Sequence, residues 1–203
     1  MAHWPWSELL DDWFGEARES PLAIADRQDA WFKPDAERDD TLSSKYGALL
    51  ERCARGDMYR WLQRPEGRLA LVIALDQLPR NLYRGTQRAF AFDAQALAWC
   101  LAAVHTGEDL RLKPVERVFL YMPLQHAEDL QAQEVGVQLY QRLAHENAEW
   151  PVFEREFLAY ARVHRDIIAR FGRFPHRNRV LHREDTPEEA DYLAGGAPRF
   201  GQR

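Results

Sequence analysis

Two histidines and two carboxylates of this chain have the residue types and the neighbourhood needed for acid–base chemistry. His126 and His164 fall on the apolar faces of two predicted long helices, and Glu128 and Asp166 each follow a histidine by two positions. An imidazole titrates near neutral pH and can both accept and donate a proton, and a carboxylate can hold it in one orientation. The pattern predicts a catalytic pair of histidines with Glu128 and Asp166 as orienting partners. The structural alternative is two core histidines satisfied by hydrogen bonds.

A second group surrounds Pro79. Asp76 lies within an almost wholly apolar run, and a buried carboxylate needs a partner, which Arg80 supplies four residues later. Pro79 has no amide hydrogen and therefore kinks or ends the helix. One interpretation is an internal ion pair that orients the kink. The other is that the kink directs Arg80, Asn81 and Arg84 into a pocket.

The segment 171–178 combines two phenylalanines, a glycine, a proline and several cationic or titratable side chains. Gly172 is a natural helix stop, and Pro175 would fix the loop that follows. A tight helix end explains one or two cations near its last carbonyl groups. It does not explain the run His176, Arg177 and Asn178, so we predict that this segment forms one wall of a site.

Positive charge is concentrated in the same region. Residues 160–183 hold seven arginines and one acidic residue, in a chain whose net charge is −5. Such an excess favours an anionic ligand or an acidic neighbouring surface, because guanidinium groups bind carboxylates and phosphates in a bidentate manner. The predicted ligand is a small anionic molecule or an acidic peptide. The residues predicted to bind it are Asp76, Arg80, Asn81, Arg84, Arg165, Arg173, His176, Arg177 and Asn178.

Other chemistries find little support. The four serines lack a nucleophile-elbow context, and no Walker loop, Gly-x-Gly-x-x-Gly, Cys-x-x-Cys or His-Glu-x-x-His motif occurs. Metal binding would draw on His126, Glu128, His164, Asp166 and His176, but their spacings match no metal motif and the arginines would repel a dication. We therefore expect no metal and no cofactor.

Composition limits the class of protein. At 203 residues with 46% hydrophobic and 29% charged residues, the chain suits one globular domain, which we predict over residues 1–194 with a C-terminal tail at 195–203. Its acidic balance argues against nonspecific nucleic-acid binding, and no apolar run is long enough for a membrane helix. The N-terminus has no signal-peptide pattern and Cys53 and Cys100 stand alone, so we expect a cytoplasmic protein with reduced, buried cysteines. The sequence does not indicate an oligomeric state.

Helical periodicity extends over nearly the whole chain, and no segment shows the alternation of a strand. The run 68–78 is apolar all round, which is typical of a helix buried among other helices. Threonine, proline and glutamate at 186–189 form a strong helix-start signal. The predicted helices cover residues 6–15, 40–55, 68–78, 93–106, 114–121, 125–147 and 152–171, with starts also at Ser20-Pro21 and Thr186-Pro187. Asp93 is predicted to cap the helix 93–106, and Gly107 to end it. Breaks near residues 79, 123 and 175 have no constant spacing, so no strict repeat is expected.

Four blocks of the chain resemble the signatures of a largely bacterial family, domain of unknown function 924. The resemblance extends over about residues 8–194, and the blocks are 76–86, 89–93, 121–128 and 164–178. It implies an all-helical, TPR-like fold and carries no established activity. The family pattern leads us to expect serine where Ala127 stands and glycine where His182 stands.

The sequence therefore predicts an all-α fold of antiparallel helical hairpins, TPR-like and without a strict period. The leading functional hypothesis is an Arg/His-lined pocket that binds a small anionic ligand or an acidic peptide. The alternative is a metal-independent enzyme that uses His/carboxylate acid–base chemistry on an anionic substrate. A third interpretation is a structural polar network that joins the helix breaks. Whether a reaction is catalysed stays open at this level.

Overall fold

A computed structural model of the chain describes residues 4–201, and every regular element in that range is helical, which confirms the predicted all-α class. Two π-helical turns, Ile73–Gln77 and Phe153–Leu158, interrupt the α-helices, and short 3₁₀ turns connect several of them. The α-helices are α1 (Ser7–Phe14), α2 (Ile24–Phe32), α3 (Ala36–Ala54), α4 (Pro65–Val72), α5 (Leu78–Leu82), α6 (Asp93–Thr106), α7 (Pro114–His126), α8 (Leu130–Glu146), α9 (Ala159–Phe171) and α10 (Pro187–Ala194).

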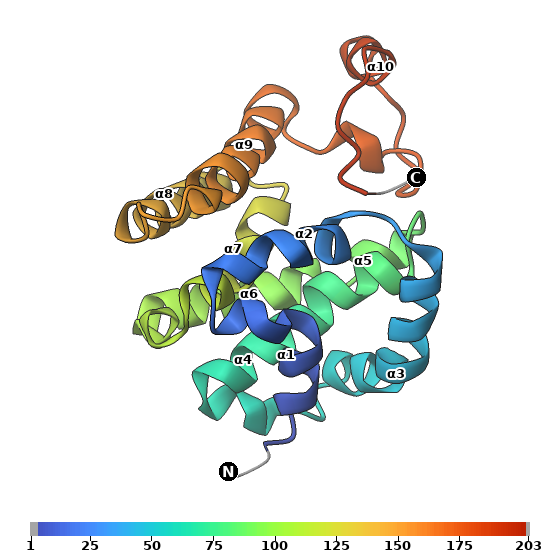
Figure 1. Cartoon of the computed structure of the whole chain (residues 1–203). Coiled ribbons are helices and arrows are strands. Elements are labelled where there is room, and N and C mark those ends of the chain that lie inside the picture. Colours follow the sequence, from blue (N-terminus) through green and yellow to red (C-terminus); the bar gives the residue numbers. More distant parts are fainter. Residues whose placement is uncertain (1–3, 202–203) are drawn as a thin grey trace.

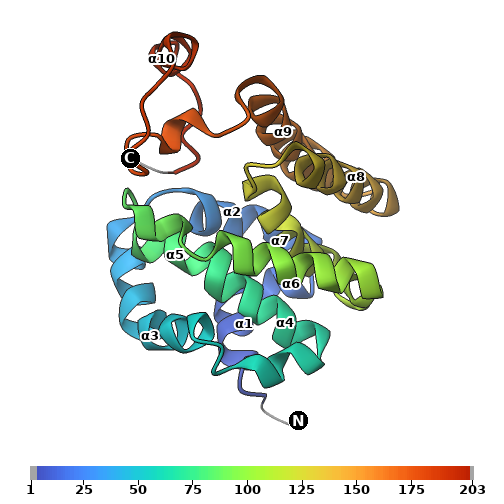
Figure 2. The same ribbon diagram turned by 180° about the vertical axis from the view of Figure 1, so that it is seen from behind.

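The helices form a main body with a C-terminal hairpin on top of it. Helices α1 to α7 make up the body, while α8 and α9 lie side by side as an antiparallel pair that packs on α7 (Figures 1 and 2). Helix α10 follows a loop region, and the chain then returns to the body beside α5 (Figure 1). Antiparallel hairpins are thus present, and the finer expectation of TPR-like packing stays a prediction.

The core is built around two helices that are buried on all sides. Residues 69–75 are wholly buried, as the all-round apolar pattern predicts, and so is most of α7 from Val115 to Gln125. Aromatic side chains of α1 and α2 fill the space over α7, where Phe14 and Trp31 meet Phe119 edge to face. Cys53 and Cys100 are free and buried, as predicted. No helix within residues 4–201 has the length and apolar character required to cross a bilayer.

Proline acts differently at two of the three predicted helix breaks. At Pro79 the helix does not end but widens into the π turn Ile73–Gln77, which relieves the clash of the proline ring with the preceding turn. The predicted break at Pro123 is wrong, because α7 continues through it to His126. The chain leaves the helix at Ala127, and the Asp129 side chain caps α8 by accepting a hydrogen bond from the Ala132 amide at 2.7 Å. His126 therefore ends α7 rather than lying within the next helix.

The last elements contain one correct and one incorrect cap prediction. Thr186 and Glu189 form the predicted capping box, with reciprocal hydrogen bonds of 3.2 and 2.8 Å. Asp93 does not cap α6 as predicted, because its carboxylate binds Arg80 instead. Part of the predicted tail contacts the rest of the fold, since Gly201 accepts a hydrogen bond from Arg84 and the ring of Phe200 stacks on that of His164. Two short segments lie outside the described residues. Residues 1–3 stand at the predicted start of the domain and belong to the segment without a signal-peptide pattern. Residues 202–203 belong to the predicted tail.

Candidate functional site

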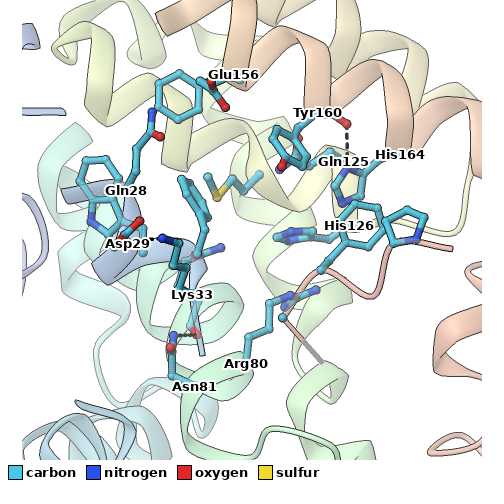
Figure 3. Close-up of a pocket in the computed structure, with 18 of the residues that line it drawn as sticks. Gln28, Asp29, Lys33, Arg80, Asn81, Gln125, His126, Glu156, Tyr160 and His164 are labelled. Atoms are coloured by element: carbon cyan, nitrogen blue, oxygen red, sulfur yellow. Dashed lines mark hydrogen bonds and ion pairs between the residues drawn. The ribbon is translucent and has the colours of Figure 1, made fainter. Parts of the chain in front are cut away.

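A cavity of about 440 Å³ lies between the main body and the C-terminal hairpin (Figure 3). Its walls come from α2, the π turn and α5 around Pro79, the end of α7, the start of α9 and the C-terminal segment. Both π-helical turns contribute lining residues, a frequent property of functional sites. The lining residues are Gln28, Asp29, Trp31, Phe32, Lys33, Gln77, Arg80, Asn81, Arg84, Met122, Gln125, His126, Tyr140, Glu156, Phe157, Tyr160, His164, Pro198, Phe200 and Gly201.

His126 is oriented by a carboxylate that lies 50 residues away in the sequence. Its Nδ1 lies 2.8 Å from Oδ1 and 3.0 Å from Oδ2 of Asp76, which is fully buried. The carboxylate can only accept, so Nδ1 of His126 carries the hydrogen and donates it. In a neutral imidazole this leaves Nε2, on the opposite side of the ring, with a free electron pair.

Asp76 remains ionised in the protein interior. Burial alone would raise its pKa, but the positive charge of Arg80 and the hydrogen bond from His126 outweigh this effect and hold the pKa below its usual range. Gln77 Nε2 donates to Oδ2 at 2.5 Å, and Arg80 Nη1 lies 3.3 Å from Oδ1. The predicted pairing of Asp76 with Arg80 is therefore present, but His126 makes the shorter contact.

The environment of His126 favours its neutral form. Burial lowers its pKa, the Arg80 charge lowers it further, and the attraction of Asp76 offsets these effects only in part. His126 thus reaches neutral pH as an uncharged base with a fixed tautomer. A base in this state can take up a proton, and the imidazolium that forms is stabilised by the carboxylate of Asp76.

His164 brings a second neutral imidazole to the same cavity. Its Nδ1 donates to the carbonyl oxygen of Tyr160 at 2.8 Å, which also leaves Nε2 with a free electron pair. Burial lowers its pKa well below the usual value, and a positive charge on His126, once that ring is protonated, would lower it further. The two rings lie with centroids 6.0 Å apart (Figure 3). The expected orienting roles of Glu128 and Asp166 are replaced by Asp76 and a backbone carbonyl group.

Arg80 and Arg177 meet at Asp93. Arg80 donates two hydrogen bonds to this carboxylate, at 2.8 and 2.9 Å, and a third to the carbonyl oxygen of Asp76 at 2.7 Å. Arg177 lies 3.5 Å from Asp93 and is held between the rings of Phe90 and Phe174, at 4.5 and 4.4 Å from their centroids. Burial, only partly offset by Asp93, lowers the pKa of Arg177 to about 10. Asp93 thus balances the positive charge beside the cavity.

Arg84 and Asn81 form another wall of the cavity. Arg84 pairs with Asp39 of α3 through hydrogen bonds of 2.9 and 3.1 Å and donates to Asn81 Oδ1 at 3.1 Å. Its Nη1 points to the C-terminal segment, where it donates to the carbonyl oxygen of Gly201 at 2.6 Å. The Asn81 amide in turn donates to the carbonyl oxygen of Gln77 at 2.9 Å, so this wall is held by α3, the π turn and α5 together.

Several predicted site residues lie outside the cavity and join elements of the fold. Glu128 accepts hydrogen bonds from the Phe174 amide and from the Arg183 guanidinium. Arg173 pairs with Glu189 at 2.6 and 2.7 Å. Asn178 is buried and connects Asp185 with Arg183. These contacts fasten the loop after α9 to α10 and to the end of α7.

The remaining predicted residues divide between the surface and the C-terminal segment. Arg165 and Asp166 pair with each other on the exposed face of α9, away from the cavity. His176 is absent from the cavity lining, but its ring lies 5.3 Å from that of Phe200, which does line it. Burial and then the charge of Arg177 lower the pKa of His176 to about 3.

The arginine-rich region is largely neutralised by carboxylates from other parts of the fold. Five of its seven arginines have an acidic partner within ion-pair distance, and four of these partners lie outside residues 160–183, so the acidic neighbouring surface offered by the sequence as an alternative is present. Little of the local positive charge is left for a ligand. The pairs are Arg165–Asp166, Arg170–Glu188, Arg173–Glu189, Arg177–Asp93 and Arg183–Glu128.

Sequence reasoning missed four residues of the site. The sequence predicts Asp93 as a helix cap and gives Asp39 no role, because their arginine partners come from other helices. Gln125 lines the cavity with a buried Oε1 that has no hydrogen-bond partner among the described residues. Phe200 lay in the predicted tail, and no local signal marks it. Gln125 could have been noticed as an amide at the end of an apolar helix.

The family pattern explains one backbone feature. His182 has φ of 55°, in the left-handed region where glycine is favoured, and glycine is the residue that the family resemblance leads us to expect there.

Within residues 4–201, no three histidine, cysteine or acidic side chains lie close enough together to hold a metal ion. The site therefore consists of two imidazoles, an oriented carboxylate, balanced guanidinium groups and aromatic walls.

Fold and site together define an all-α protein with a histidine-containing cavity that its own C-terminal segment partly closes. The family model for bacterial proteins of unknown function, DUF924, matches residues 9–197, and the chain belongs to this family. The structure of a protein of unknown function, ATU0120 from Agrobacterium tumefaciens, is similar with a TM-score of 0.80 and 37% sequence identity, over 94% of this chain and 97% of that chain. No curated protein matches the sequence.

Proposed function

We propose that this protein is an enzyme that performs general acid–base chemistry on a small molecule bound in the cavity, with His126 as the base. The observation that carries the proposal is the buried pair of Asp76 and His126, whose 2.8 Å contact fixes the imidazole tautomer at the cavity wall. A structural histidine needs no ionised carboxylate in the core, and burying one is costly.

The chemistry follows from the two imidazoles. Nε2 of His126 accepts a proton from a hydroxyl group, a water molecule or an acidic C–H of the bound compound, and the electron pair stays on that compound. Asp76 stabilises the resulting imidazolium, and the proton returns later in the cycle. His164, whose ring centroid is 6.0 Å away, offers a second Nε2 to the same bound molecule.

The test is a turnover screen in which His126 is varied. Purified protein is incubated with mixtures of esters, amides, lactones, phosphate esters and hydroxy acids, and product formation is followed by NMR. His126→Gln should lower turnover by about 10²–10⁴-fold, the usual contribution of a general base. His145→Gln, at an exposed position on α8, is the matched control and should not change the rate. Equal turnover by wild type and His126→Gln would contradict the proposal.

A second candidate function is the binding of a small anionic ligand or an acidic peptide without turnover. One observation favours it: two guanidinium groups, those of Arg80 and Arg84, line the cavity. Thermal unfolding with carboxylates, phosphates and acidic peptides tests this function, since a ligand at 100 times its dissociation constant stabilises by about 2.7 kcal/mol. Absence of any shift with the folded wild type, or an equal shift with Arg84→Gln, would count against it.

A further inference from the structure

The C-terminal segment places an aromatic ring inside the cavity. Residues 197–201 return from α10 to the body, and the ring of Phe200 stacks on that of His164, with centroids 3.9 Å apart and an interplanar angle of 29°. The rings of Phe174 and His176 lie around it at 6.4 and 5.3 Å. Phe200 also packs against the small apolar cluster that contains Ile168. Three rings and an apolar floor thus form a subsite for a flat aromatic group.

The residue after Phe200 supplies a backbone oxygen to the guanidinium group of Arg84. The carbonyl oxygen of Gly201 accepts a hydrogen bond from Arg84 Nη1 at 2.6 Å. Gly201 has φ of +72°, and a Cβ atom there would lie 3.2 Å from Arg84 Nη1 and 3.4 Å from the Phe32 carbonyl oxygen. Glycine therefore allows this close approach of the backbone to the guanidinium group.

Phe200 itself adopts φ of 47°, which is unfavourable for a bulky side chain. A local backbone preference therefore does not place the ring in the cavity. Its contacts with His164 and Phe174, together with the Arg84 hydrogen bond of the next residue, hold it there. These contacts of the ring and of the following carbonyl group offset the cost of the backbone conformation.

We propose that the C-terminal segment occupies the site as an internal ligand, and that the ligand it stands in for is an aromatic compound with a carbonyl group, such as an amide of an aromatic residue. Asp39 already compensates the charge of Arg84, so its remaining N–H suits a neutral oxygen. The buried, unpartnered Oε1 of Gln125 is an acceptor for the amide N–H of such a compound. The inference rests on the proposed function, because it names the substrate class of the same site.

The probe for the first experiment is N-acetyl-L-phenylalaninamide, with N-acetyl-L-alaninamide as its non-aromatic control. Calorimetry compares the full-length wild-type chain with Phe200→Ala. Removing the internal competitor should lower the dissociation constant of the aromatic probe at least about tenfold. Arg199→Ala, exposed in the same segment, should bind the probe as the wild type does. Equal affinity for wild type and Phe200→Ala, or for the two probes, would overturn the inference.

A second set of measurements follows opening of the segment in the wild type and distinguishes a free small molecule from a peptide. Trypsin cleaves after Arg199, and the rate tracks the fraction of molecules in which the segment is open. Saturating aromatic probe should accelerate this cleavage in the wild type, and the alanine control should not. The acetylated peptide Ala-Pro-Arg-Phe-Gly-Gln-Arg, the sequence of residues 197–203, tests the peptide source on Phe200→Ala chains. An unchanged cleavage rate at saturating aromatic probe would overturn the inference.

The outcomes separate this inference from the proposed function. His126→Gln leaves the aromatic subsite in place, so it should bind the aromatic probe as the wild type does while it loses turnover. If His126→Gln abolishes turnover and the aromatic probe binds no form of the chain, the ligand class is wrong and the acid–base proposal stands. If the aromatic probe binds and His126→Gln retains full turnover, the acid–base proposal is wrong and the ligand class stands.

Discussion

Replacing Asp76 by asparagine tests the reasoning about the buried pair most directly. The substitution keeps the size and shape of the side chain but removes its charge. One of the two oxygens becomes an NH₂ group, which is a donor and would face the donors of His126, Gln77 or Arg80. The wild-type carboxylate accepts from the first two, at 2.8 and 2.5 Å, and lies 3.3 Å from the third.

The expected loss of stability follows from these contacts. Breaking a buried ion pair by removing one partner costs about 3–5 kcal/mol. Arg80 keeps its two hydrogen bonds to Asp93 in the variant, so its charge stays compensated in part. We therefore expect Asp76→Asn to lower the free energy of unfolding by about 2–3 kcal/mol at pH 7.

Urea unfolding followed by tryptophan fluorescence measures this loss. With a urea dependence of about 2 kcal/mol per molar, the midpoint should fall by about 1–1.5 M without a change in slope. The pKa of Asp76 is lowered in the folded state, so its stabilisation is complete above the carboxyl pKa of the unfolded chain, about 3.9, and is lost as the pH falls below it. The difference between wild type and variant should therefore shrink below about pH 4.

The matched control is Asp166→Asn, at a side chain that is 66% exposed and paired only with its neighbour Arg165. A surface change of this kind should alter stability by less than about 0.5 kcal/mol. Equal shifts of the urea midpoint in both variants would refute a stabilising role of the buried carboxylate. A difference between wild type and Asp76→Asn that grows as the pH is lowered would refute it as well.

Two further predictions concern histidine burial and helix packing. The pKa of His176 in the folded chain is about 3, so between about pH 3 and about pH 6.5 only the unfolded chain takes up a proton at this side chain. Over this range the free energy of unfolding should depend on pH less steeply in His176→Gln than in wild type, by about 1.4 kcal/mol per pH unit, with His145→Gln as control. Gly67→Ala should destabilise by about 3 kcal/mol in thermal unfolding, because its Cβ would lie 2.3 Å from the Trp61 carbonyl oxygen, whereas Gly47→Ala, with open space around it, should stabilise by up to about 1 kcal/mol.

The prediction of helices from the sequence succeeded where local rules decide the structure. The capping box at Thr186, the stop at Gly107 and the burial of residues 69–75 all follow from residues within a few positions of one another. The break at Pro123 was misplaced because tertiary packing overrides a local preference. That proline lies in a fully buried helix, and the neighbouring elements hold the helix together through it.

The sequence indicated which segments line the cavity, but it did not distinguish the side chains that face the cavity from those that join helices. Arg80, Asn81, Arg84, His126 and His164 line the cavity as the sequence suggested, because prolines and helix ends beside apolar runs mark places where polar groups can reach an interior space. The outer members of the predicted set, among them Asp166 and Arg173, belong to surface or connecting ion pairs. Residue type alone does not distinguish a cavity-lining arginine from one that fastens two helices.

The sequence by itself determined the helical class, the buried central helices and the side chains able to move a proton, because each depends on composition and on spacing within one helix. Only the tertiary structure decided the partners of these side chains. It paired His126 with Asp76 across 50 residues, matched Arg80 with Asp93, and brought Phe200 from the end of the chain onto His164. The physical reason is that hydrogen bonds and ring contacts act over a few ångströms, and packing sets which distant residues come that close.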